Sequence, residues 1–281
     1  MRRPTRLTAL AVGLTTGLLV AWPGTASATG TSNPHLTVVP HALFLQGGII
    51  SPSAAPTPDQ ETFVDSIPMY ITWKGSDADG ICGYDVKADY AGDFPQTLVS
   101  GTHATRYQGT ATDYDDQYGG GSQKIEGWIV VAHDCAGHTT SRESVLYPTV
   151  TQENGHSPAD GGVVPTIGYS GTWSRATCTC WSAGAVRYTT QNGAAATITL
   201  DTTSPRMDVG LVMEKAPNRG KFTLLIDGVN KGTVDTRAGT ATHRVIVWSG
   251  TLATNGHHVV RLVNQATAGR PRIDLDAVLV N

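Results

Sequence analysis

Short runs rich in β-branched and aromatic residues recur along most of this chain, and turn-forming residues separate them. Examples of the runs are MYITWKG, KIEGWIVVAHD, KFTLLIDG, HRVIVWSG and HHVVRLVN. Val, Ile, Thr, Tyr and Trp favour a pleated, half-buried backbone, whereas Gly, Asn, Asp and Pro between the runs favour turns. Asp227-Gly228 and Asn255-Gly256 tolerate the positive φ of a tight hairpin. No window longer than about ten residues keeps a 3.6-residue apolar period, so we predict an all-β chain of antiparallel strands.

Residues 1–28 have the composition of a secretory signal peptide. Three arginines precede an apolar run over residues 7–22, and the small residues Ala26 and Ala28 follow it. This order predicts cleavage after Ala28 and export from the cell. The apolar run is short and interrupted by glycines and threonines, which argues against a membrane anchor. We therefore expect a secreted, extracellular protein with no membrane insertion after cleavage.

The length, charge and cysteine count limit the classes of fold and partner. A chain of 281 residues is long enough for two domains. The formal net charge is −3, and the signal segment carries arginines and no acids, so the mature chain is more negative still. A polyanionic partner such as nucleic acid is therefore not expected. The 4 cysteines form an even count in an exported chain, so disulfide bonds are the default.

The stretch YPTVTQENGHSPADGGVVPTIG, near the middle of the chain, is rich in proline and glycine and poor in apolar residues. Such a composition is typical of a linker. We place the linker at residues 148–166. It separates a first domain over residues 29–147, which includes a loose N-terminal arm, from a second domain over residues 167–281.

Two stretches of the first domain resemble bacterial immunoglobulin-like or fibronectin type III domains. ITWKGSDADGICGYDV resembles their second and third strands, and GWIVVAHDCAGHTTS resembles their late hairpin, with His138 where those domains have asparagine. The resemblance covers roughly residues 60–147 and implies a β-sandwich with Cys82 and Cys135 at one end, where they could form a disulfide. A rival interpretation makes His133, Cys135 and His138 metal ligands. No second cysteine lies nearby at ligand spacing, so we favour the disulfide and expect no metal.

Two acidic loops of the first domain, SDADG and ATDYDDQYGGG, could together supply oxygen ligands for Ca²⁺. Hard cations need several carboxylates and carbonyls close together. The spacing does not match a helix-loop-helix calcium loop, and solvated turns are the alternative that we favour. We expect no cofactor.

From Tyr169 to the end, the chain resembles the C-terminal jelly-roll domains of galactose-binding-like type that occur in many secreted bacterial proteins. The resemblance is carried by YSGTWSR, AGAVRYTTQNGAAATITL, GLVMEKAPNRGKFTLLIDGVNKGTVD, VIVWSGTLATNGHHVVRLV and GRPRIDLDAVLV, in that order. It implies a β-sandwich of about eight strands that is similar to carbohydrate-binding modules. It does not by itself imply a ligand, because this fold hosts binding and structural roles alike.

Cys178 and Cys180 would lie in a loop or at a strand edge of such a domain. A bridge between residues two apart requires a bent backbone and closes only a small ring. A redox pair would need a helix N-terminus or a base nearby, and a metal site would need two more soft ligands. We favour a structural bridge over these two alternatives.

Aromatic and arginine side chains of the second domain are the candidates for glycan contact. Sugar rings stack on flat aromatic surfaces, and loop arginines can bond sugar hydroxyls or carboxylates. Core packing is the alternative role for the tryptophans of this domain, and we expect it for Trp173 and Trp248. Trp181 follows the cysteine loop and is the best candidate among them for an exposed ring. The predicted ligand-binding residues are Trp181, Tyr188, Arg219 and Arg270.

Asp274 and Asp276 in IDLDA look like a catalytic carboxylate pair, but they lie two residues apart on one strand. Glycoside hydrolysis sets its two acids across a cleft, so we favour a structural role for both residues. The sequence contains no Gly-x-Ser-x-Gly elbow, no His-Glu-x-x-His motif and no phosphate-binding glycine loop.

We therefore predict a non-catalytic binding protein whose jelly roll binds polysaccharide, cell-surface glycan or another extracellular surface. The alternatives are a structural or adhesion protein with no small-molecule ligand, and an accessory part of a glycan-degrading system. A further alternative is an enzyme with an unrecognised site, which would require a deep pocket with convergent titratable groups.

Overall fold

The structure is a computed structural model that describes residues 31–52, 64–90, 93–112, 125–157 and 163–281. The signal segment and most of the second acidic loop, from residue 113, lie outside these ranges. Within them the regular structure is β throughout, apart from one 3-10 turn at Ser182–Gly184. The all-β prediction is confirmed. None of the helical structure in the described ranges is long and apolar enough to cross a bilayer.

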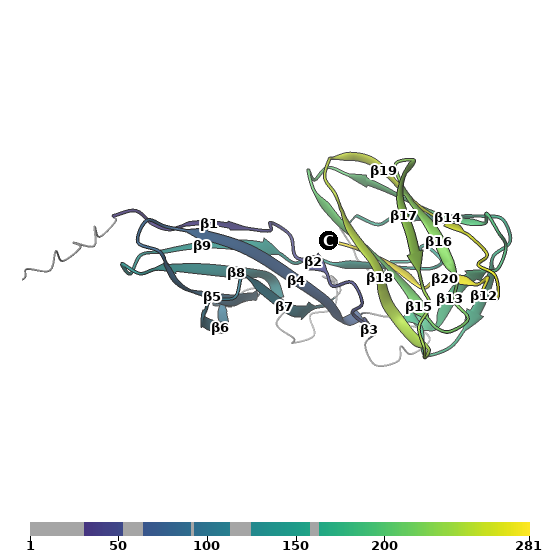
Figure 1. Ribbon diagram of the computed structural model, residues 1–281, viewed down its shortest axis with the longest axis horizontal. Helices are drawn as coiled ribbons and strands as arrows, with labels where there is room; N and C mark the ends of the chain where they lie inside the picture. Colours follow the sequence, from purple (N-terminus) through teal and green to yellow (C-terminus); the bar gives the residue numbers. More distant parts are fainter. Residues whose placement is uncertain (1–30, 53–63, 91–92, 113–124, 158–162) are drawn as a thin grey trace, which may run out of the picture.

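The first domain is a β-sandwich of two antiparallel sheets (Figure 1). In one sheet β4 lies at the centre and pairs with β1, β2, β3 and β7, and the other sheet has the order β6-β5-β8-β9. The strands are β1 (His35–Val38), β2 (Leu43–Phe44), β3 (Ser51–Pro52), β4 (Val64–Ser76), β5 (Ile81–Tyr90), β6 (Gln96–Thr102), β7 (Arg106–Ala111), β8 (Ile125–Asp134) and β9 (Thr139–Val145).

The alternation along β8 determines which face of the strand enters the core. Trp128, Val130 and Ala132 are buried, as period-2 patterning requires for one face of a strand. The Trp128 ring meets the edge of the Tyr107 ring, with centroids 5.2 Å apart. Aromatic pairs in this edge-to-face arrangement add stability beyond the area they bury.

The disulfide Cys82–Cys135 joins β5 to the turn after β8, which confirms the predicted pairing. The metal interpretation of this turn is wrong, because the Cys135 sulfur is bonded to Cys82. The His133 ring bonds the Asp85 carboxylate at 2.9 Å, and the His138 ring bonds the Asp134 carboxylate at 2.8 Å. These two histidines hold the hairpin through separate partners.

The second domain is a jelly-roll sandwich. Its two large sheets have the orders β10-β21-β15-β18 and β11-β14-β19-β16-β17, and a small sheet has the order β12-β13-β20. Without β11, these orders are those of the eight strands of a jelly roll. The strands are β10 (Thr149–Gln152), β11 (Thr166–Ser170), β12 (Ser174–Thr177), β13 (Ala185–Thr189), β14 (Ala195–Thr202), β15 (Met207–Lys215), β16 (Lys221–Ile226), β17 (Val229–Asp235), β18 (Thr242–Leu252), β19 (Gly256–Asn264), β20 (Ile273–Leu275) and β21 (Ala277–Val280).

The hairpin predicted at Asp227-Gly228 joins β16 to β17. Both residues have positive φ, 51° for Asp227 and 77° for Gly228. A two-residue loop with φ > 0 at both positions matches the right-handed twist of the flanking strands. The dipeptide therefore fixes this hairpin locally.

Part of the stretch predicted as a linker is a buried strand. Residues Thr149–Gln152 form β10, which pairs with β21 along its whole length, and all four residues are buried. The segment contains one apolar residue, Val150, so its composition resembles that of a loop. Its burial comes from pairing with the last strand of the chain, which a local pattern does not reveal.

The two domains share a continuous hydrophobic core. Phe44, Leu146 and Val150 belong to one buried cluster with Val212 and Leu279 of the second domain. Backbone bonds also cross the junction, where the Gly47 N–H donates to the Ile246 carbonyl at 2.8 Å. Figure 1 shows β2 and β3 lying against the second domain at this junction.

Candidate functional site

Half-buried aromatic and arginine side chains gather where β11, β12 and β13 meet at one side of the second domain. The Tyr169 ring on β11 and the Trp173 ring just before β12 have centroids 4.9 Å apart and planes tilted by 55°. The Trp173 indole N–H donates to the Ser170 carbonyl at 3.1 Å, which fixes the orientation of the ring. Both rings pack partly on the core and keep part of their surface in solvent.

Two arginines complete this group. The Arg187 guanidinium lies 5.1 Å from the Tyr169 ring centroid, within the range of cation–π contact. The Arg175 Nε lies 3.0 Å from an oxygen of the Glu153 carboxylate, which is buried, while half of the Arg175 side chain is exposed. We call Tyr169, Trp173, Arg175 and Arg187 the Trp173 cluster.

The buried residue Glu153 bonds two members of the Trp173 cluster. Its carboxylate bonds Arg175, and its backbone carbonyl accepts the Tyr169 hydroxyl at 2.6 Å. Burial raises the pKa of the Tyr169 hydroxyl, so this group remains a donor over the physiological pH range. The aromatic rings and the guanidinium groups are thus ordered before any ligand arrives.

This arrangement can bind a molecule that has both apolar faces and hydroxyl or carboxylate groups. Aromatic faces pack against C–H groups, and each guanidinium carries five N–H donors in a planar fork. The ion pair with Glu153 and the contact with Tyr169 use only some of those donors.

The expectation that Trp181 is exposed is wrong. Its side chain is 8% exposed, and its ring meets the edge of the His243 ring at a centroid distance of 6.2 Å. The chain turns inward immediately after the Cys178–Cys180 disulfide, because the Ser182 N–H donates to the Asp276 carboxylate at 2.9 Å. The buried indole offers no face on which a sugar could stack.

Arg219 is buried rather than solvated in its loop. Its guanidinium bonds the Asp274 carboxylate through Nε at 2.6 Å and the Glu214 carboxylate through Nη2 at 2.6 Å. The Glu214 N–H donates to the other Asp274 oxygen at 2.9 Å. These bonds tie the end of β15 to β20, which is a structural role for both Arg219 and Asp274.

Tyr188 and Arg270 extend the same network. The Arg272 guanidinium lies 4.0 Å over the Tyr188 ring and 3.7 Å from the Asp274 carboxylate. Arg270 donates to the Arg219 carbonyl at 2.9 Å and forms an ion pair with Asp235 that lowers the pKa of that carboxyl to about 2.

Of the four predicted ligand-binding residues, Tyr188, Arg219 and Arg270 thus lie in one network within the domain, whereas Trp181 contacts His243. Arg219 and Arg270 bond groups of the same domain, the Tyr188 ring packs against the Arg272 guanidinium, and Trp181 and Arg219 are buried. Trp173 and Trp248, which we expected in the core, both pack against it but are only half-buried. A turn signal could have identified the half-burial of Trp173, because Gly171, with φ of 80°, turns the chain just before the indole.

The described residues contain no group of three or more His, Cys, Asp or Glu side chains that could hold a metal ion. In the loop SDADG the Asp77 carboxylate accepts the Asp79 N–H at 2.9 Å, as in a solvated Asx turn. The preference for solvated turns over a calcium site stays a prediction for the second loop, which lies outside the described ranges from residue 113.

No family model and no curated protein matches the sequence. The chain is similar in structure to the CBM36-1 domain of a multidomain xylanase from the hindgut metagenome of Trinervitermes trinervoides, with 16% identity, 48% of this chain and 96% of that chain covered, and a TM-score of 0.33. It is also similar to a family 35 carbohydrate binding module from Clostridium thermocellum, with 13% identity, coverage of 48% and 98%, and a TM-score of 0.31. An exo-beta-1,3-galactanase from Phanerochaete chrysosporium matches with 9% identity, coverage of 76% and 54%, and a TM-score of 0.33.

Proposed function

We propose that this chain is a secreted, non-catalytic protein that binds carbohydrate through the Trp173 cluster. The observation that carries the proposal is the half-buried Trp173 ring, which is oriented by its own hydrogen bond and packed at 4.9 Å from Tyr169. Secretion is supported by the composition of residues 1–28 and by two disulfides, which persist in oxidising compartments.

The chemistry of the cluster favours a glycan over other extracellular ligands. The tilted Trp173 and Tyr169 rings offer apolar surface to the C–H faces of a sugar, and Arg175 and Arg187 offer N–H donors to its hydroxyls or carboxylates. Pre-ordering by Glu153 lowers the conformational entropy lost on binding. Glycoside hydrolysis sets two acids across a cleft, whereas the acid bonded to this cluster, Glu153, is buried and paired with Arg175.

A binding assay of the full mature chain against a panel of insoluble polysaccharides tests the proposal. Trp173→Ala should abolish retention by the polysaccharide that the wild type binds, while the protein stays folded by circular dichroism. Trp248→Ala is the matched control, because Trp248 is also half-buried but lies on β18, in the other part of the sandwich. Equal retention of the Trp173 variant and the wild type would contradict the proposal.

A second candidate function is adhesion to another protein, and exposed apolar groups of the first domain favour it. Phe94 is 92% exposed just before β6, and Leu98 on that strand is 37% exposed. Exposed apolar groups near a sheet edge are typical of contact surfaces. In that case Phe94→Ser should reduce adhesion while Trp173→Ala leaves it unchanged.

A further inference from the structure

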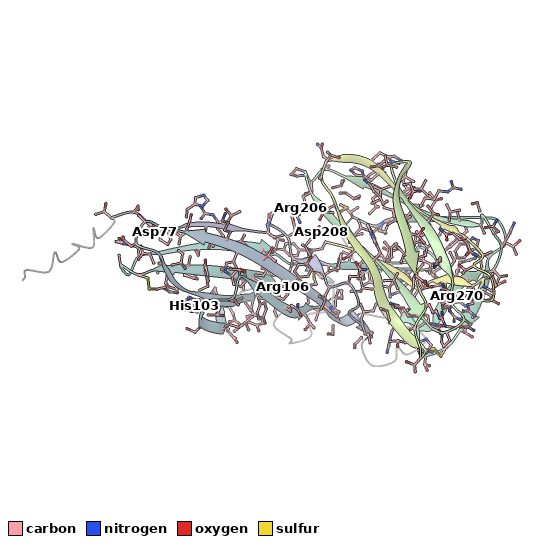
Figure 2. All side chains as sticks on the ribbon, in the orientation of Figure 1. Asp77, His103, Arg106, Arg206, Asp208 and Arg270 are labelled. Atoms are coloured by element: carbon pink, nitrogen blue, oxygen red, sulfur yellow. A yellow bond between two sulfur atoms is a disulfide. The ribbon has the colours of Figure 1, made fainter. Side chains whose placement is uncertain are left out.

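A hollow of about 140 Å³ lies at the junction of the two domains. The first domain contributes Leu43, Phe44 and Tyr70, and the second contributes Asp208 and residues 249–251. Figure 2 labels Asp208 and Arg206 where β15 approaches the first domain. The hollow is therefore complete only when both domains are in place.

Asp208 is the central polar group of this hollow. It is 1% exposed, and burial raises the pKa of its carboxyl. Its Oδ1 accepts the Thr251 hydroxyl and lies 3.5 Å from the Arg206 Nη2. Its Oδ2 has no hydrogen-bond partner among the described residues. Burying a carboxylate oxygen without a hydrogen-bond partner costs free energy of folding. A ligand that donates a hydrogen bond to this atom would remove that cost.

The hydroxyl groups of Thr251 and Ser249 already donate their hydrogens within the protein. The Thr251 hydroxyl donates to Asp208, and the Ser249 hydroxyl donates to the Phe44 carbonyl at 3.0 Å. Both oxygens keep lone pairs that can accept, although Thr251 also receives a long bond of 3.4 Å from Arg206.

These groups determine the charge and the hydrogen-bonding groups of a ligand that would fit the hollow. Arg206 already balances the charge of Asp208, so a neutral ligand fits better than a cation or an anion. The ligand must supply a donor to the Asp208 Oδ2, and a hydroxyl supplies it.

The remaining walls are apolar. Leu43, Phe44 and Tyr70 line the first-domain side, and the Arg106 guanidinium holds the Tyr70 ring by lying 4.1 Å from its centroid. A cavity of about 150 Å³ accommodates benzene, so this hollow has room for about one six-membered ring. Because the hollow is partly open, substituents on the ring can extend into solvent. A pyranose combines a ring of this size, apolar C–H groups and adjacent hydroxyls.

We propose that the junction hollow is a saccharide site, separate from the Trp173 cluster, that takes a single neutral sugar ring. One of its hydroxyls donates to the Asp208 Oδ2, and its C–H groups pack against Leu43, Phe44 and Tyr70. The inference shares the ligand class of the proposed function but uses different residues, so either site can fail without the other.

The experiment is ligand-observed NMR with the full mature chain and the methyl glycosides of xylose, glucose and galactose, with glycerol as a polyol that lacks a ring. At least one glycoside should bind, and glycerol should not. Asp208→Asn keeps an acceptor for Thr251 but replaces the Oδ2 by an N–H donor. It should weaken binding by about tenfold or more, which corresponds to about 1.4 kcal/mol. All of these measurements are made in the Trp173→Ala background, so that glycoside binding at the Trp173 cluster does not contribute to the signal.

A cavity-filling variant keeps the test valid if Asp208→Asn does not fold. Leu43→Phe retains every polar group of the hollow and occupies its space, so it should abolish glycoside binding in the Trp173→Ala background, while the same change in the wild type leaves polysaccharide retention through Trp173 intact. The proposal is overturned if no glycoside binds to the folded Trp173→Ala protein, if glycerol competes as well as the glycosides do, or if both variants bind like that parent protein. In the first two outcomes the hollow holds only water or small polyols.

Discussion

Asp276 is an example of how a single buried residue sets both local geometry and pH dependence. It interrupts the last strand between β20 and β21, its Oδ1 accepts the Ser182 N–H, and its Oδ2 has no partner among the described residues. Burial, and then the nearby Asp274 carboxylate, raise the pKa of Asp276 well above its ordinary value. The folded state therefore favours the protonated carboxyl.

A raised pKa in the folded state means that the stability contributed by Asp276 is fully present below its ordinary pKa and is lost as pH rises toward the folded value. Asp276→Asn keeps a carbonyl acceptor for Ser182 and removes the titration. It should be more stable than the wild type at pH 7 and close to it at pH 4, as measured by urea unfolding at both pH values. A variant that is less stable at pH 7 would show that the charged carboxylate is needed there.

The two tryptophans that follow turns in the second domain show where residue-level prediction fails. Trp181 was expected to be more exposed than Trp173, but Trp181 is buried, whereas Trp173 is half-buried and packs against the core. The burial of Trp181 depends on the bond between Ser182 and Asp276, which are 94 residues apart in the chain. A loop pattern contains no information about a partner at that distance. The half-burial of Trp173 follows from the local turn at Gly171, so a sequence pattern could have predicted it.

At the scale of elements, the alternating patterns located most of the strands, because burial of one face leaves a period of two in the sequence. The strand β8 and the hairpin between β16 and β17 were identified from local residues alone. The strand β10 was missed because it contains threonines and a glutamine, and its burial depends on the last strand of the chain. Local chemistry thus predicts an element where the element carries its own apolar face.

The two disulfides differ in how much of the chain they restrain. Cys82–Cys135 spans a sequence separation of 53, whereas Cys178–Cys180 spans a separation of 2. On the chain-entropy model, replacing the first pair by alanines should cost about 4 kcal/mol, and replacing the second should cost less than about 2 kcal/mol. Guanidinium unfolding of the two double variants measures the difference. Equal losses would mean that enthalpy or residual structure in the unfolded chain dominates.

At the scale of the whole molecule, the shared core makes the two sandwiches one structural unit. Residues 41–50 lie between the domains, and the Ile50 N–H donates to the Arg244 carbonyl at 3.0 Å. The last residue, Asn281, donates to the Ala42 carbonyl at 2.9 Å and accepts the Tyr147 N–H at 2.7 Å. Asn281 therefore links β21 of the second domain to Ala42 and Tyr147 on the first-domain side of the junction. Any ligand of the junction hollow would be bound by both domains together.

This shared core predicts that the protein unfolds in one cooperative transition, and Phe44 provides the test. Phe44 belongs to the first domain, is 1% exposed, and lies 3.2 Å from the position that a Cβ on Gly210 of the second domain would occupy. Removing a buried phenylalanine costs about 3–5 kcal/mol, and here the cavity would face both sandwiches. Calorimetry of the full mature chain should give a single peak that Phe44→Ala moves as a whole to lower temperature.

Ile198→Ala is the control, because it removes a fully buried side chain from the core of the second domain alone. It should also move the single peak. Two resolved peaks, with Phe44→Ala lowering only the one that belongs to the first domain, would mean that the sandwiches unfold independently and that the junction contributes little to the stability of either.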